Sequence, residues 1–173
     1  MSASFVPNPR HPMIMAKAVQ EGLNAFLLLV STGLYHELSQ PGTGRRYPRG
    51  RRRKGKARKG RNKRAQGVHV ASAPGQPPAV DTGALRRSWQ VTASAAARGS
   101  AEGGRGPILR RMKSFGMVGY RLGSPLPYAR IDSGWGRVKA RPYISPVLAD
   151  AAPSFPQIMA VAIRRHFPEG GPR

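Results

Sequence analysis

The sequence predicts an α+β fold, in which a long N-terminal helix and a kinked C-terminal helix pack on a small, mostly antiparallel β-sheet with a long basic loop. Three observations support this prediction. Apolar residues recur every three or four positions over residues 12–38 and again over 144–167. Short extended segments lie between them, and residues 39–80 show almost no apolar periodicity. We therefore expect a flexible arm over 1–11, one domain over 12–167 that contains the 39–80 loop as an insertion, and a flexible tail over 168–173.

The N-terminal helix is predicted from one apolar stripe, bounded by Pro12 in its first turn and by Pro41 and Gly42 at its end. The stripe consists of Met15, Val19, Leu23, Phe26, Val30, Leu34 and Leu38. Within the helix, a run of five consecutive apolar residues extends around more of the helix surface than one stripe does. This predicts burial on two sides, against the sheet and against a neighbouring subunit. This run, predicted to pack subunits together, consists of Phe26, Leu27, Leu28, Leu29 and Val30.

The sheet is predicted from segments that follow the loop. Residues 88–95 alternate, with Trp89, Val91 and Ala93 on one face, which predicts a strand. Residues 98–107 are rich in glycine and predict a flexible turn. Residues 107–114 and 115–123 predict two further extended segments, 125–136 a turn-rich connection, and 137–144 a last short strand.

The C-terminal helix is predicted over residues 144–167 with a break in its middle. Pro153 and Pro156 cannot donate backbone hydrogen bonds inside a helix, so they kink or break it. Ser154, between them, is a candidate cap for the second half.

The charge of the chain predicts an anionic partner. It has 30 basic and 7 acidic residues and a net charge of +23, and thirteen of the twenty residues 45–64 are basic. Such a run favours non-specific contact with nucleic-acid phosphates or with an acidic protein surface. Tyr47 is the single aromatic residue in it, so stacking on bases is barely supported. The predicted contact residues are Arg45, Arg46, Arg49, Arg51, Arg52, Arg53, Lys54, Lys56, Arg58, Lys59, Arg61, Lys63 and Arg64.

The composition argues against an enzyme, a metal site or a cofactor. The chain has no cysteine, so thiolate chemistry and disulfides are excluded. The four histidines, at 11, 36, 69 and 166, have no metal-ligand spacing, and the seven carboxylates form no obvious pair. The longest uncharged apolar stretch, residues 22–35, is shorter than the roughly 20 residues needed to span a bilayer, so we expect a soluble protein without a membrane partner.

The most distinctive segment is HVASAPGQPPAVDTGALRRSW, residues 69–89. Its first half predicts a stiff, turn-rich approach with polyproline character. Asp81 or Thr82 can cap a short helical turn whose inward anchor is Leu85, and Gly83 permits close approach of the backbone.

This segment resembles a family of small morphogenesis proteins, the neck or tail-completion proteins of long-tailed double-stranded DNA bacteriophages and related gene-transfer particles. The pattern Ser-x-Pro-Gly-x-Pro-Pro, followed by Thr-Gly-x-Leu-x-x-Ser, is joined by similar stretches at 118–136 and 140–151. The resemblance covers residues 12–167, with 45–64 and 98–112 as insertions, and departs from the family pattern at Asp132-Ser133-Gly134. Its motif residues are Pro74, Gly75, Pro77, Pro78, Thr82, Gly83, Leu85, Ser88, Tyr128, Ala129, Gly134, Arg141 and Pro142.

The resemblance implies a structural role without an enzymatic activity. Such a subunit forms a ring, a hexamer or a higher ring matched to the portal, at the head–tail joint of the virion, and is made in the host cytoplasm. Its partners are portal, adaptor or head-closure proteins above, tail-tube or tail-terminator proteins below, and the genomic DNA in the channel. The 39–80 loop either lines that channel or reaches a neighbouring ring. Alternatives are a tail-terminator ring of the same particle and a free, non-specific nucleic-acid-binding protein that uses residues 45–64.

Overall fold

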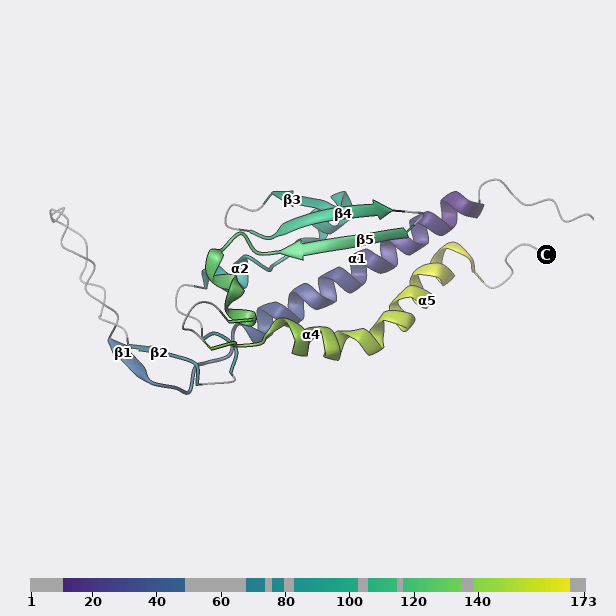
Figure 1. The fold of residues 1–173 in the computed structure, drawn as a ribbon. Helices are drawn as coiled ribbons and strands as arrows, with labels where there is room; N and C mark the ends of the chain where they lie inside the picture. Colours follow the sequence, from purple (N-terminus) through teal and green to yellow (C-terminus); the bar gives the residue numbers. More distant parts are fainter. Residues whose placement is uncertain are drawn as a thin grey trace, which may run out of the picture.

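The computed structural model shows an α+β fold, as predicted, in three layers (Figure 1). It describes residues 11–48, 68–73, 76–79, 83–102, 106–114, 117–134 and 139–168. Helix α1 (His11–Glu37) lies in the middle, with a three-stranded antiparallel sheet on one side and helices α4 and α5 on the other (Figure 1). The sheet has the order β3 (Ser100–Glu102), β4 (Ile108–Ser114), β5 (Met117–Gly123). The predicted arm and tail lie almost entirely outside the described residues.

Helix α1 is buried on two sides, because its apolar residues face two separate cores. Val30, Leu34 and Leu38 pack in one core with Trp89, Tyr143, Val147 and Ala151. Leu27 packs in the other, with Val91, Ala95, Ala96 and Leu109. The two-sided burial of the predicted run is thus confirmed, although Leu29 remains 40% exposed. Helices α4 and α5 of the same chain cover part of the second side, and packing of this run against a neighbouring subunit stays a prediction.

The sheet is built around the β4–β5 hairpin, which the sequence predicted. Leu109 on β4 is fully buried and lies opposite Leu122 on β5, so this face of the sheet packs on α1. On the other face, Arg110 lies directly opposite Arg121, and both side chains are exposed. Part of the segment predicted as a flexible turn forms β3, which pairs with β4 from Ser100 opposite Arg110 to Glu102 opposite Ile108.

The predicted strand over residues 88–95 is wrong. Helix α2 (Ala84–Arg87) leads through a turn into α3 (Ala93–Arg98), and Thr92 caps α3 by accepting a hydrogen bond from the Ala95 amide. The apolar residues Trp89 and Val91 are two positions apart, as in a strand, but each packs in a different core. Ser31 of α1 fixes the turn: its hydroxyl donates to the Trp89 carbonyl at 3.0 Å and accepts from the Val91 amide at 2.7 Å.

The last predicted strand is also wrong, because its described part, residues 139–143, contains no strand and leads directly into α4 (Ile144–Ala151). The Asp132 carboxylate, at the end of the 3₁₀ helix η1 (Pro127–Asp132), accepts hydrogen bonds from the amides of Tyr143 and Ile144 at 2.7 and 2.9 Å. The Asp132 carboxylate therefore satisfies amides at the start of α4, which in a strand would have donated to a neighbouring strand.

The C-terminal helix is interrupted where the prolines predict it. A 3₁₀ turn, η2 (Ala152–Ser154), separates α4 from α5 (Phe155–His166). Ser154 has helical backbone angles and its side chain makes no capping hydrogen bond, so its predicted role as a cap is wrong. Helices α4 and α5 together form what we call the α4–α5 arm. A glycine lets this arm approach α1 closely, because a Cβ added at Gly33 would lie 2.7 Å from Cγ1 of Val147.

Candidate functional site

Two short paired strands lie at one end of the molecule and flank the basic segment in the sequence (Figure 1). Strands β1 (Arg46–Pro48) and β2 (Val68–Val70) are antiparallel, with Pro48 opposite Val68, so the two ends of the segment are held together. The predicted 39–80 loop thus contains an ordered stem. Arg45 and Arg46 are exposed on this stem, and the other eleven predicted contact residues lie outside the described residues.

Backbone hydrogen bonds continue the pairing of the stem beyond β1 and β2. The Gly44 amide donates to the Ala71 carbonyl at 2.7 Å, and the Ala71 amide donates to the Arg45 carbonyl at 3.0 Å. A Cβ at Gly44 would lie 2.8 Å from that Ala71 oxygen, so the approach requires glycine.

Arg141 attaches the stem to the rest of the domain. Its guanidinium donates to the Ser72 carbonyl at 3.2 Å and to the Ser72 hydroxyl, and Ser72 is nearly fully buried. The Arg141 amide donates to the Ile131 carbonyl at 2.8 Å. One arginine therefore ties the segment that leaves β2 to the chain before α4, through charge-assisted hydrogen bonds.

Several motif residues form the junction between these segments and the core. Gly83 has φ 71°, a left-handed conformation that favours glycine, and it precedes α2. Leu85 packs against the core around Leu34, as predicted. Ser88 is fully buried; its hydroxyl donates to the Leu85 carbonyl at 2.7 Å and lies 2.7 Å from the Ser124 hydroxyl.

The motif residue Ala129 meets the same core from the C-terminal side. Its neighbour there, Tyr143, is fully buried, packs edge-on against Trp89 at 6.0 Å between ring centroids, and donates its hydroxyl proton to the Ala129 carbonyl at 2.9 Å. Burial raises the pKa of Tyr143 to about 12. Gly134 has φ 90°, just after Asp132, at the point where the sequence departs from the family pattern.

The remaining motif residues are less informative. Pro77 and Pro78 are partly buried, and Pro142 is exposed. Pro74, Gly75 and Thr82, together with the predicted cap Asp81, lie outside the described residues, as does the side chain of Tyr128.

The described residues contain no group of three or more side chains that could hold a metal ion. The two histidines whose side chains are described are far apart. His36 lies near the C-terminal end of α1, whereas His166 on α5 contacts Glu21 at 3.0 Å, fifteen positions earlier on α1. At a rise of 1.5 Å per residue, the distance along α1 from His36 to Glu21 is about 22 Å.

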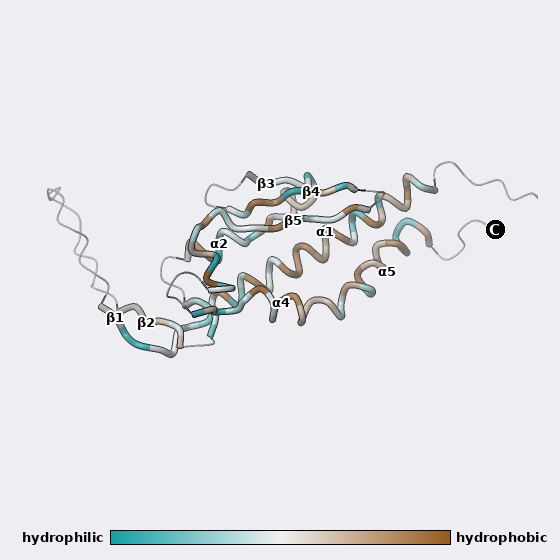
Figure 2. The backbone as a smooth tube through the Cα atoms, viewed as in Figure 1, coloured by the Kyte–Doolittle hydropathy of each residue, from teal (hydrophilic) through white to brown (hydrophobic). Residues whose placement is uncertain are grey.

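The helices contrast with the basic hairpin in charge. Together α1 and residues 144–166 carry three basic and three acidic residues, whereas the chain as a whole carries +23. Figure 2 shows apolar segments recurring along α1 and along α4–α5. The charged residues of this helical layer are Lys17, Arg164, Arg165, Glu21, Glu37 and Asp150.

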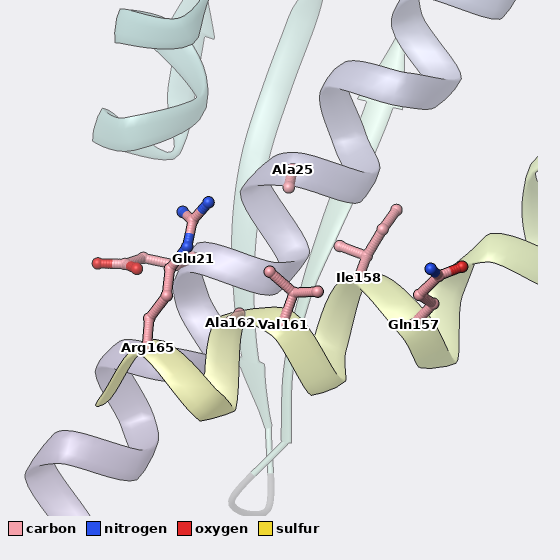
Figure 3. Close-up of a pocket in the computed structure, with 7 residues that line it drawn as sticks. All are labelled: Glu21, Ala25, Gln157, Ile158, Val161, Ala162 and Arg165. Atoms are coloured by element: carbon pink, nitrogen blue, oxygen red, sulfur yellow. The ribbon is translucent and has the colours of Figure 1, made fainter. Parts of the chain in front are cut away.

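Two shallow grooves follow the line where α1 meets α4 and α5, and we call this line the helical seam. One groove has a volume of about 290 Å³, with Ala25, Ile158 and Val161 along it and Glu21 and Arg165 at one end (Figure 3). The other has a volume of about 280 Å³ and is lined by Leu29, Thr32, Gly33, His36, Val147, Asp150, Ala151 and Ser154. Of these residues, only Leu29 belongs to the run predicted to pack subunits together. Glu21, Ala25 and Leu29 are spaced four residues apart, and this spacing in the sequence already places them next to each other on one face of the helix.

Pro12–Glu37 and Ile144–His166 are long and apolar enough to cross a membrane, judged by length and composition alone. Of their most apolar windows, 22% and 17% are buried within the described structure. The expectation of a soluble protein without a membrane partner stays a prediction.

No protein-family model, curated protein or solved structure matches this chain. The resemblance to phage neck proteins therefore rests on the quoted sequence motifs.

Proposed function

We propose that this protein is a structural virion subunit that forms a ring at the head–tail joint of a tailed phage and surrounds the DNA channel. One observation supports the proposal most strongly. Several motif residues that resemble neck proteins, Leu85, Ser88, Ala129 and Arg141, meet at one junction with the core, and Arg141 ties this junction to the segment that leaves β2. These motif residues thus serve as a scaffold next to the paired strands that flank the basic segment.

The basic segment suits a channel that DNA must pass. Lysine and arginine contacts to phosphates carry no sequence information, so they hold DNA while allowing it to slide. Several copies in a ring multiply this charge around one axis, which requires an anionic counterpart, DNA or an acidic neighbouring ring. Portal or adaptor proteins above and tail proteins below complete the proposed assembly.

The test is a loop-neutral variant in which the eleven basic residues from Arg49 to Arg64 become serine or asparagine. Pro48 and Val68 are kept, so the stem can pair. We expect unchanged thermal unfolding, and a slope of log affinity against log salt that falls by about 0.9 for each phosphate that the variant no longer neutralises. Particles that carry the variant should still join heads to tails but retain less DNA.

The control is a variant of equal length with Lys and Arg exchanged for one another, which keeps the charge and should keep DNA retention. An electron-microscopy map that places the protein elsewhere than the neck contradicts the proposal. Loss of all biological function in the loop-neutral variant, with no protein in particles, would favour the free nucleic-acid-binding protein instead.

A further inference from the structure

The helical seam is an apolar surface that the fold leaves open among the described residues. Leu29 on α1 is 40% exposed and Val161 on α5 is 44% exposed, and each lines one of the two grooves. Single exposed apolar residues are ordinary on a protein surface. Here they belong to two consecutive grooves, which extend from Glu21 to His36 on α1, about 22 Å of helix.

The charge around the seam distinguishes between possible occupants. Two of the seven acidic residues of the chain, Glu21 and Asp150, line the grooves, and Arg165 is the matching cation. DNA or an acidic protein would instead be attracted to the hairpin and the sheet, where the positive charge lies. A helix that lies on an anionic membrane has lysine and arginine along its polar face, and the seam lacks that pattern.

A second copy of this chain fits the seam better than these partners do. Two chains of net charge +23 repel each other wherever their basic parts meet. The helical layer is neutral, so two copies can bring apolar residues together there without that repulsion. Asp150 and Arg165 lie toward opposite ends of the α4–α5 arm, so each seam offers an acid and a base to a neighbour.

We propose that the helical seam, centred on Ala25, Leu29 and Val161, is the contact through which copies of this chain assemble. The inference rests on the proposed function in that it supplies the subunit contact of the proposed ring. Successive copies in a ring meet through two different surfaces, so the seam of one copy is one of the two.

The absence of cysteine makes the test direct, because an introduced cysteine is the only thiol in the chain. Ala25→Cys and Val161→Cys are exposed positions on the seam. Met13→Cys on α1 and Met112→Cys on β4 are matched controls, 74% and 53% exposed and outside both grooves. In the assembled full chain, a maleimide should react more slowly with the seam thiols than with the control thiols, because the neighbouring copy covers the seam.

A second measurement uses the double variant Leu29→Lys with Val161→Lys, with Met13→Lys as control. Sedimentation velocity should show self-association weakened at least tenfold in the double variant and unchanged in the control. Circular dichroism should show unchanged helicity in both. Equal maleimide reactivity at seam and control positions, or an unchanged assembly in the double variant, overturns the inference.

The outcomes separate this inference from the proposed function. Rings that persist in the double variant overturn the seam contact and leave the neck proposal standing. Seam thiols that are protected in an assembly absent from the virion neck support the contact and contradict the neck proposal. Binding to uncharged phosphatidylcholine vesicles that the double variant loses, with a monomeric wild-type chain, overturns the inference in favour of a membrane surface.

Discussion

The helical layer and the rest of the molecule divide the properties of the chain between them. The helices α1, α4 and α5 have no net charge and supply much of the core around Leu34, whereas the remaining segments carry all of the net charge of +23. Because charge repels charge and apolar burial drives packing, a chain with these two parts can assemble through one while it attracts an anion with the other. The difference shows how a strongly basic protein can also be a self-associating one.

The largest expected effect tests whether stability resides in the buried side of α1. Leu34 is 1% exposed between Trp89 and Tyr143. Leu34→Ala should lower the free energy of unfolding by about 3 kcal/mol, because it removes buried surface and leaves a cavity. Leu29→Ala, on the same helix at 40% exposure, should cost less than about 1 kcal/mol.

Urea denaturation of both variants measures this contrast. Equal losses would show that the seam side of α1 is as buried in solution as the core side, and would sharpen the case for a covered seam. The loop-neutral variant should match the wild type in the same experiment.

A smaller effect tests the close packing of α4–α5 on α1. Gly33→Ala places a Cβ against Val147, whose β-branched side chain cannot easily move, whereas Gly22→Ala meets the flexible end of Met159. Both changes gain roughly 1 kcal/mol of helix propensity. We expect Gly22→Ala to be neutral or slightly stabilising and Gly33→Ala to be less stable than the wild type by about 1 kcal/mol.

Thermal unfolding followed by circular dichroism compares the two glycine variants directly. If Gly33→Ala is the more stable of the pair, the helical layer is packed more loosely than the structure shows.

The smallest effect concerns the positive side of the molecule. Arg110 and Arg121 lie directly opposite each other on the exposed face of the sheet, and like charges in that position destabilise the pairing. Arg121→Glu should raise the free energy of unfolding by about 0.5 kcal/mol at low salt, with the gain shrinking as salt screens the pair.

Lys113→Glu is the matched control for Arg121→Glu, because it makes the same charge change on β4 opposite the uncharged Val118. Denaturation curves at two salt concentrations should show a gain for Arg121→Glu alone. A gain of equal size in both variants would point to the net charge of the whole chain as its cause.

Residues 88–95 show why a local pattern can mislead. Their alternation is real, but Trp89 and Val91 point into two different cores from a turn that Ser31 holds. Thr92 then caps the start of α3. The outcome depends on a serine almost sixty positions away, which a reading of eight residues does not contain. The β4–β5 hairpin was predictable because its partners are adjacent in the chain.

Local features of the chain were enough to predict the α+β class, the long first helix, the proline break between α4 and α5, and the separation of a basic segment from apolar helices. These follow from periodicity, from missing amide donors and from charge. Three other features emerged from the packing of distant segments: α4 and α5 cover one side of α1, β1 and β2 pair at the two ends of the basic segment, and a seam between helices stays open. They depend on which distant surfaces meet, because burial is a property of pairs of segments and not of either one.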